Sequence, residues 1–104
     1  MIKISVMYPN DAGSRFDHGY YRDWHMPMIK RLLAERCVRY TVDRGLAGGT
    51  PGASAPFVAM CHVFCESEQS YQEGMAAHGK EIFSDIANFT DLVPLVQISE
   101  IVID

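Results

Sequence analysis

Positive charge and long apolar runs are both scarce in this sequence. The 104 residues contain nine Lys and Arg against thirteen Asp and Glu, which gives a net charge of −4. The basic residues are scattered and form no stripe, whereas a nucleic-acid-binding surface needs concentrated positive charge. No apolar run approaches the roughly 18 residues that a membrane span requires. We therefore expect a protein that binds neither nucleic acid nor membrane.

Cysteine is also sparse, and its spacing argues against disulfide formation. There are three cysteines, an odd number, and no C-x-x-C pair. Cys61 and Cys65 lie on one predicted strand at a separation of roughly 13 Å, whereas the Cα atoms of a disulfide must lie within about 7 Å. Residues 1–6 predict a strand and not a signal peptide. The expected location is the cytoplasm.

The common motifs for metals and nucleotides are missing. The sequence has no H-E-x-x-H, no Cys/His cluster at zinc spacing and no phosphate-binding glycine loop. Residues 45–52 are rich in glycine but lack both the lysine and the helix start that a P-loop needs. We therefore predict no metal and no nucleotide cofactor. Four separated histidines leave a haem or metal ligand open.

What the sequence does contain is a regular succession of predicted strands and helices. Hydrophobic residues make up 48% of the chain, which is typical of a globular protein, and the length predicts one domain over residues 1–104. Proline and glycine mark the expected interruptions of the helices. The predicted elements are strands 2–8, 38–46, 57–65 and 95–103, a helix 17–35 interrupted near Pro27, a loop 47–56, and a helix 67–78 that breaks at Gly79 and resumes at 81–83.

The order β-α-β-β-α-β predicts an α+β fold, a ferredoxin-like sandwich with one antiparallel sheet and both helices on one face. Residues 57–60 and 101–103 are apolar at both strand parities, so the other sheet face is expected to be buried as well. The chain has no further helix to cover that face. A second copy of the chain is the natural cover, and the sequence predicts a homodimer.

Residues 20–28 are the segment richest in chemistry, with two phenols, an indole and an imidazole before a proline. Residues four apart share a helix face, so Tyr21 pairs with His25 and Tyr20 with Trp24. The proline forces the helix to kink or restart. The segment therefore predicts the wall of a pocket. His25 is either a general acid/base or a partly buried histidine that bonds a carbonyl freed by the kink.

Two further histidines and one carboxylate each have two interpretations. His78, near the predicted end of the second helix, either caps the helix dipole or faces the pocket with Tyr71, two turns earlier. Asp85 either orients a histidine or bonds the backbone of a turn. His62 is either a satisfied histidine at the dimer interface or a pocket residue.

An ordered set of short motifs spans nearly the whole chain: Tyr8-Pro9-Asn10, Phe16-Asp17, Tyr20-Tyr21, His25-Met26-Pro27, His78-Gly79-Lys80-Glu81-Ile82 and Asp85-Ile86-Ala87-Asn88-Phe89-Thr90-Asp91. Their order and spacing resemble the EthD family of dimeric α+β barrel proteins. The resemblance implies a homodimer whose two sheets face each other as a barrel. It also implies a pocket in each subunit between sheet and helices, lined by the His-x-Pro region that here begins at His25.

The resemblance also implies a substrate class. Members of the family are often classed as oxidoreductases. Relatives in the barrel superfamily include cofactor-free quinone-forming monooxygenases, muconolactone isomerase, haem-degrading enzymes and polyketide cyclases. In some of those cyclases a tyrosine and a histidine on the corresponding helix carry the catalysis, an arrangement that Tyr71 and His78 resemble. The fold therefore narrows the substrate to small, often aromatic or lactone-like molecules without fixing the reaction.

From these observations we predict a protein that binds a small hydrophobic or aromatic metabolite in a catabolic pathway. The first hypothesis is a cofactor-free oxidoreductase-type enzyme or acid/base catalyst. The alternatives are an isomerase, cyclase or decarboxylase of the same superfamily, and a non-catalytic ligand-binding or accessory dimer that serves a larger oxygenase. The predicted catalytic residues are His25, His78 and Tyr21. The predicted substrate-binding residues are Tyr8, Tyr20, Trp24, Tyr71, Asp85 and Phe89.

Overall fold

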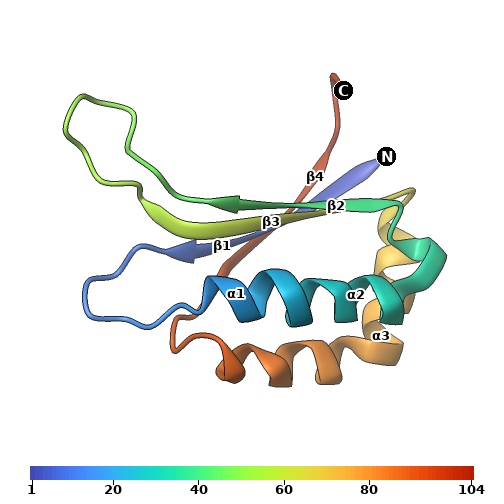
Figure 1. Cartoon of the computed structure of the whole chain (residues 1–104). Helices are drawn as coiled ribbons and strands as arrows, with labels where there is room; N and C mark the ends of the chain where they lie inside the picture. Colours follow the sequence, from blue (N-terminus) through green and yellow to red (C-terminus); the bar gives the residue numbers. More distant parts are fainter.

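The structure is a computed structural model that describes residues 1–104. A four-stranded antiparallel sheet forms one layer of the protein (Figure 1). The helices all lie on one face of this sheet (Figure 1). The predicted α+β, ferredoxin-like architecture is therefore confirmed. The strands are β1 (Ile2–Pro9), β2 (Arg39–Arg44), β3 (Phe57–Cys65) and β4 (Leu95–Glu100), in the spatial order β2-β3-β1-β4.

The first helical region consists of four short pieces. They are α1 (His18–Tyr20), a π-helical turn (Tyr21–His25), α2 (Met26–Leu33) and a 3-10 turn (Ala34–Arg36). The predicted interruption near Pro27 is therefore confirmed and consists of the π-helical turn directly before this proline. Pro27 is the second residue of α2, where its missing N–H costs little because the first turn of a helix leaves these donors unpaired.

The second helical region is one continuous helix, α3 (Glu68–Ser84), followed by a 3-10 turn (Asp85–Asn88). The predicted break at Gly79 is wrong. A glycine inside a helix costs only about 1 kcal/mol relative to alanine, which packing readily outweighs. At Gly74 the packing requires the absence of a side chain, because a Cβ atom at this position would lie 2.7 Å from the Leu33 side chain of α2. The two helices thus meet closely over the sheet.

The two faces of the sheet differ in composition. The face toward the helices supplies core residues such as Ile4, Cys61 and Val63, each at most 4% exposed. The prediction that the other face is buried as well requires a second copy of the chain and stays a prediction. Strand alternation and the pairing register place both apolar and polar side chains there. On this open face Met7, Met60 and Phe64 stand beside Lys3, Ser5, Arg39, Thr41, Asp43 and His62.

The strands end earlier than predicted at two places. Strand β2 covers 39–44 instead of 38–46, and β4 stops at Glu100 instead of Ile103. The residues after β4 lead away from the helices (Figure 1). Val102 and Ile103 in this tail are 85% and 90% exposed. None of the helices has the length and apolar character needed to cross a lipid bilayer.

Candidate functional site

The π-helical turn sets the position of His25. In this turn the N–H of Met26 donates to the carbonyl of Tyr21, five residues earlier, and the helix widens. The wide turn leaves room for the ring of Pro27, which clashes with the preceding turn of a regular α-helix. His25 is 2% exposed, and its ring stacks on Tyr21 with 5.7 Å between the centroids. The predicted shared face of Tyr21 and His25 is confirmed.

Asp85 holds one ring nitrogen of His25. It opens the 3-10 turn after α3, and its Oδ2 lies 2.8 Å from His25 Nδ1. Its other oxygen, Oδ1, accepts hydrogen bonds from the Tyr20 hydroxyl at 2.7 Å and from the Asn88 side-chain amide at 2.9 Å. Of the two interpretations of Asp85, the structure therefore shows the contact with a histidine. Tyr20 contacts this carboxylate and lies outside the cavity described below.

Burial and hydrogen bonding together determine the protonation of this pair. Burial lowers the pKa of His25, and the Asp85 carboxylate offsets that effect only in part. Burial acts to raise the pKa of Asp85, but hydrogen bonds from His25, Asn88 and Tyr20 outweigh it, and the pKa is lowered. At neutral pH the carboxylate is therefore ionised and the imidazole is neutral, with its proton on Nδ1. The other ring nitrogen, Nε2, keeps its lone pair.

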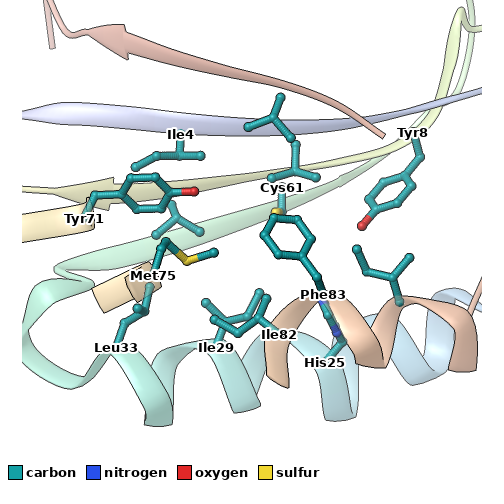
Figure 2. A pocket seen from close by; sticks show the side chains of 14 residues that line it. Ile4, Tyr8, His25, Ile29, Leu33, Cys61, Tyr71, Met75, Ile82 and Phe83 are labelled. Atoms are coloured by element: carbon teal, nitrogen blue, oxygen red, sulfur yellow. The ribbon is translucent and has the colours of Figure 1, made fainter. Parts of the chain in front are cut away.

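His25 lines an apolar cavity of about 40 Å³ between the sheet and the helices (Figure 2). Fourteen residues line this cavity and thirteen of them are hydrophobic. They come from β1, β3 and β4 on one side and from the two helical regions on the other. Phe83 and Val96 in the lining are 51% and 47% exposed, so these two residues mark the side on which the cavity meets solvent.

Two phenol hydroxyls and one thiol are the other polar groups of the lining. Tyr8 comes from β1 and Tyr71 from α3, and Figure 2 shows both hydroxyls directed into the cavity. Burial raises the pKa of both, and neither hydroxyl has a hydrogen-bond partner in the chain, so both remain protonated donors. Burial raises the pKa of Cys61 to about 11, so this thiol stays protonated and is a poor nucleophile.

Tyr21 and Phe89 form the packing behind His25. They are 1% and 0% exposed, and the Phe89 ring centroid lies 4.6 Å from that of His25. The Tyr21 hydroxyl has no hydrogen-bond partner. Neither residue lines the cavity. The structure places both rings behind the imidazole of His25 and outside the cavity lining, and the catalytic role of Tyr21 and the ligand contact of Phe89 stay predictions.

Two predicted site residues, Trp24 and His78, lie outside the cavity lining. Trp24 is 69% exposed, since the π-helical turn directs it outward while His25 points inward. His78 is half-buried in α3 and does not line the cavity. The lining residues of α3 include Tyr71, Met75 and Ile82. Of the predicted pair Tyr71 and His78, only Tyr71 reaches the cavity.

His62 lies on the open face of the sheet, where both of its ring nitrogens lie beside polar side chains. Ser5 Oγ lies 2.7 Å from Nδ1, and Asp43 Oδ2 lies 3.2 Å from Nε2. His62 does not line the cavity. Of its two interpretations, the structure therefore shows the satisfied histidine. Elsewhere, no three His, Cys, Asp or Glu side chains gather in an arrangement that could hold a metal ion.

Sequence reasoning missed most of the cavity wall. Ile29, Met75 and Phe83 line the cavity but were not predicted as site residues. The available signal was the periodicity of apolar residues, which shows which side chains of a strand or helix face the space between sheet and helices. Asn88 was not predicted as a site residue, yet it donates to Asp85. Its spacing of three residues from Asp85 within a helical turn was the available signal.

Comparisons with known proteins agree with this arrangement. Residues 12–92 match the family model described as EthD domain. The chain is similar to an EthD-like protein from Ralstonia eutropha JMP134, with 52% identity, a TM-score of 0.95, and coverage of 99% of this chain and 93% of that one. A comparison with functionally curated proteins finds no match.

Two more distant structures share the fold. An ethyl tert-butyl ether D (EthD) family protein from Bacillus halodurans C-125 has 21% identity and a TM-score of 0.64, with 96% of this chain and 97% of that chain covered. A protein described as dimeric and ferredoxin-like, from an uncultured marine organism, has 13% identity and a TM-score of 0.59, with 100% and 97% covered. At these identities the likeness concerns the fold.

Proposed function

Because this chain belongs to the EthD family, we propose that its cavity binds a small hydrophobic or aromatic molecule and that His25 transfers a proton to or from it. One observation carries the proposal: Asp85 holds Nδ1 of His25 at 2.8 Å, while Nε2 has no hydrogen-bond partner in the chain. An imidazole fixed at one nitrogen and free at the other has the arrangement of a general base.

The apolar wall supports the choice of ligand. Thirteen of the fourteen lining residues are hydrophobic, and such walls bind rings by removing apolar surface from water. The cavity of about 40 Å³ is smaller than the roughly 150 Å³ of an engineered cavity that holds benzene. A ring-sized ligand must therefore displace a side chain. Phe83 is the natural choice because it is half exposed, and Figure 2 shows its ring pointing toward Cys61 across the cavity.

The proposed step is a proton transfer. A C–H or O–H bond of the ligand breaks, the proton moves to Nε2 of His25, and the electron pair stays on the ligand. The imidazolium that forms is stabilised by the ionised Asp85 at Nδ1. Proton transfer of this kind belongs equally to oxidoreductase-type, isomerase and cyclase reactions. As proposed, the step uses side chains of this chain and no bound metal or nucleotide.

We also propose a homodimer that joins the open sheet faces of two copies in the cytoplasm. Met60 and Phe64 on that face and the exposed tail residues Val102 and Ile103 supply apolar surface for it. The fold neighbour described as dimeric and ferredoxin-like supports the same assembly. Native mass spectrometry tests it: a species of twice the chain mass is expected, and a monomer at micromolar concentration would contradict it.

Deuterium exchange tests the proton transfer without knowledge of the natural substrate. Acetophenone is a small aromatic ketone with exchangeable methyl protons beside its carbonyl. In D₂O the protein is expected to accelerate loss of the methyl proton signal above the buffer rate, and His25→Gln is expected to abolish the acceleration. The His62→Gln variant, altered at a histidine outside the cavity, serves as the control.

The alternative is a non-catalytic ligand carrier. The apolar lining of the cavity favours binding whether or not chemistry follows. If acetophenone binds in the cavity but its methyl protons exchange at the buffer rate, the proton-transfer proposal is wrong and the carrier is supported. If the exchange is accelerated equally by wild type and His25→Gln, a group other than His25 is the base.

A further inference from the structure

We infer that the natural ligand of this cavity is an uncharged molecule with a carbonyl or hydroxyl oxygen, and that the Tyr8 hydroxyl binds this oxygen. The inference rests on the proposed function, because it names the class of molecule that the same cavity takes. Three features of the structure carry it: the charge of the lining, the position of Tyr8, and the position of Tyr71.

The lining contains no positive charge. None of the fourteen residues is a lysine or an arginine, and the single titratable nitrogen base, His25, is neutral at neutral pH. The nearest formal charge behind the wall is the Asp85 carboxylate, which holds His25 at 2.8 Å. A carboxylate or phosphate in this cavity would lose its hydration without a cationic partner and would also be repelled by Asp85. The cavity therefore rejects anions.

Tyr8 presents an unused donor in the same cavity wall as His25. Its side chain is 1% exposed, its hydroxyl has no hydrogen-bond partner in the chain, and Figure 2 shows that hydroxyl directed into the cavity. Tyr8 and His25 pack against the same two rings, those of Tyr21 and Phe89. A ligand that fills the cavity covers this hydroxyl, and a covered donor without a partner is costly, so a ligand oxygen that accepts this bond is favoured over a hydrocarbon of the same shape.

Tyr71 offers a second donor at the other end of the cavity. It comes from α3, and Figure 2 shows its hydroxyl at the end opposite Tyr8. A ligand with a single oxygen that sits beside His25 therefore uses Tyr8 and leaves Tyr71 free. This separation makes Tyr71→Phe the matched control for Tyr8→Phe, because each variant removes one phenol hydroxyl from the same cavity wall.

Three probes of nearly equal shape test the inference by binding alone. Acetophenone is uncharged and has one oxygen, benzoate replaces its methyl group by a charged oxygen, and α-methylstyrene replaces its oxygen by carbon. Dissociation constants are measured from shifts of the backbone amide signals of the lining residues in NMR spectra. The full-length protein is used as wild type, Tyr8→Phe, Tyr71→Phe and Phe83→Ala, the last of which provides room for the ring.

Acetophenone is expected to bind at least about 100-fold more tightly than benzoate, because a buried charge without a partner costs several kcal/mol. Tyr8→Phe is expected to weaken the binding of acetophenone by about three- to tenfold, because one hydrogen bond is lost. The same variant is expected to leave the binding of α-methylstyrene unchanged. Tyr71→Phe is expected to keep the affinity for acetophenone within about twofold of wild type, since that ligand uses no donor at the Tyr71 end.

Two results would overturn the inference while the proposed cavity and proton transfer still stand. One is binding of benzoate as tight as that of acetophenone. The other is an affinity for acetophenone that is unchanged by Tyr8→Phe. If none of the three probes shifts the lining signals, even in Phe83→Ala, the inference is overturned together with the proposed cavity. Because binding is measured without turnover, a failure of the exchange assay does not affect this test.

Discussion

The protein contains two histidines in contact with an aspartate, and the two pairs lie on opposite faces of the sheet. His25, under the helices, is bonded by Asp85 at Nδ1 and leaves Nε2 free in an apolar cavity. His62, on the open face, is hydrogen-bonded with Ser5 Oγ at Nδ1 (2.7 Å), and the Asp43 carboxylate lies 3.2 Å from its Nε2. The Asp43 side chain is 56% exposed, whereas that of Asp85 is 16% exposed.

The difference shows that a His–Asp contact alone does not make a site. Both nitrogens of His62 already lie beside polar side chains, and its carboxylate neighbour is screened by solvent. His25 has a free nitrogen, a fixed ring orientation and an apolar cavity beside it. The free nitrogen and the apolar cavity, rather than the aspartate, distinguish the candidate base from the structural histidine.

Exchanging each histidine for glutamine is expected to give the largest contrast. His25→Gln removes the base and is expected to lower the deuterium exchange of acetophenone by about 100-fold or more, within the range of general base catalysis. His62→Gln is expected to keep the exchange rate and to lower the free energy of unfolding by about 1 kcal/mol, because it disturbs one hydrogen bond and a screened ion pair. Exchange rates and urea unfolding check both. Equal loss of exchange in the two variants would remove the distinction.

Exchanging each aspartate for asparagine is expected to give the next contrast. In Asp85→Asn the imidazole loses the acceptor that keeps its proton on Nδ1, and the exchange rate is expected to fall by roughly 10- to 100-fold. Asp43→Asn, the matched change beside His62, is expected to leave the rate unchanged. The same assay measures both. An Asp85→Asn variant with the full wild-type rate would show that His25 needs no orienting partner.

Opening the cavity is expected to have a smaller, opposite effect. Phe83→Ala removes the ring that crosses the cavity, so the affinity for acetophenone is expected to rise by several fold, because the ligand no longer displaces a side chain. Val93→Ala removes an exposed apolar side chain (82% exposed) that lies outside the lining and is the control. NMR titration measures both affinities. Weaker binding in Phe83→Ala would show that Phe83 contacts the ligand instead of occupying its place.

The smallest expected effect concerns stability at mildly acidic pH. Burial lowers the pKa of His25 in the folded chain, whereas an unfolded histidine titrates near about 6.5. As the pH falls through about 6.5, the unfolded chain binds a proton that the folded chain does not, so the free energy of unfolding decreases. Urea unfolding at pH 7.5 and 5.5 measures this decrease. The decrease is expected to be the same in wild type and His62→Gln and smaller in His25→Gln. An equal decrease in all three proteins would show that titratable groups other than His25 cause it.

Much of the fold followed from local sequence patterns. The nearly continuous apolar run in residues 57–65 and the order of strands and helices predicted the sheet and its helical cover, and β3 has the predicted bounds. Pro27 predicted an interruption, but the sequence pattern did not contain the π-helical turn that precedes it, in which His25 packs against Phe89, a residue far along the chain. Gly79 predicted a break in the second helix, but α3 is continuous because its packing over the sheet outweighs the low helix propensity of one glycine.

The candidate site was predictable where a single segment carries the signal. His25, Tyr8 and Tyr71 were predicted and line the cavity. The link between Asp85 and His25 joins residues 60 positions apart, and only the fold decides between this link and a turn. Trp24 was misplaced because the widened turn rotates the residues around it, a change that helical periodicity does not contain.

The central claim is that His25 is a neutral imidazole with its proton on Nδ1 and a free Nε2 in the cavity. Nitrogen-15 NMR of the imidazole rings, recorded from pH 8 to pH 5, measures tautomer and pKa in one experiment. The account predicts that at neutral pH the His25 Nδ1 is protonated and Nε2 is not, with a pKa below the ordinary histidine value. An imidazolium at neutral pH, or a proton on Nε2 with Nδ1 bare, would contradict it.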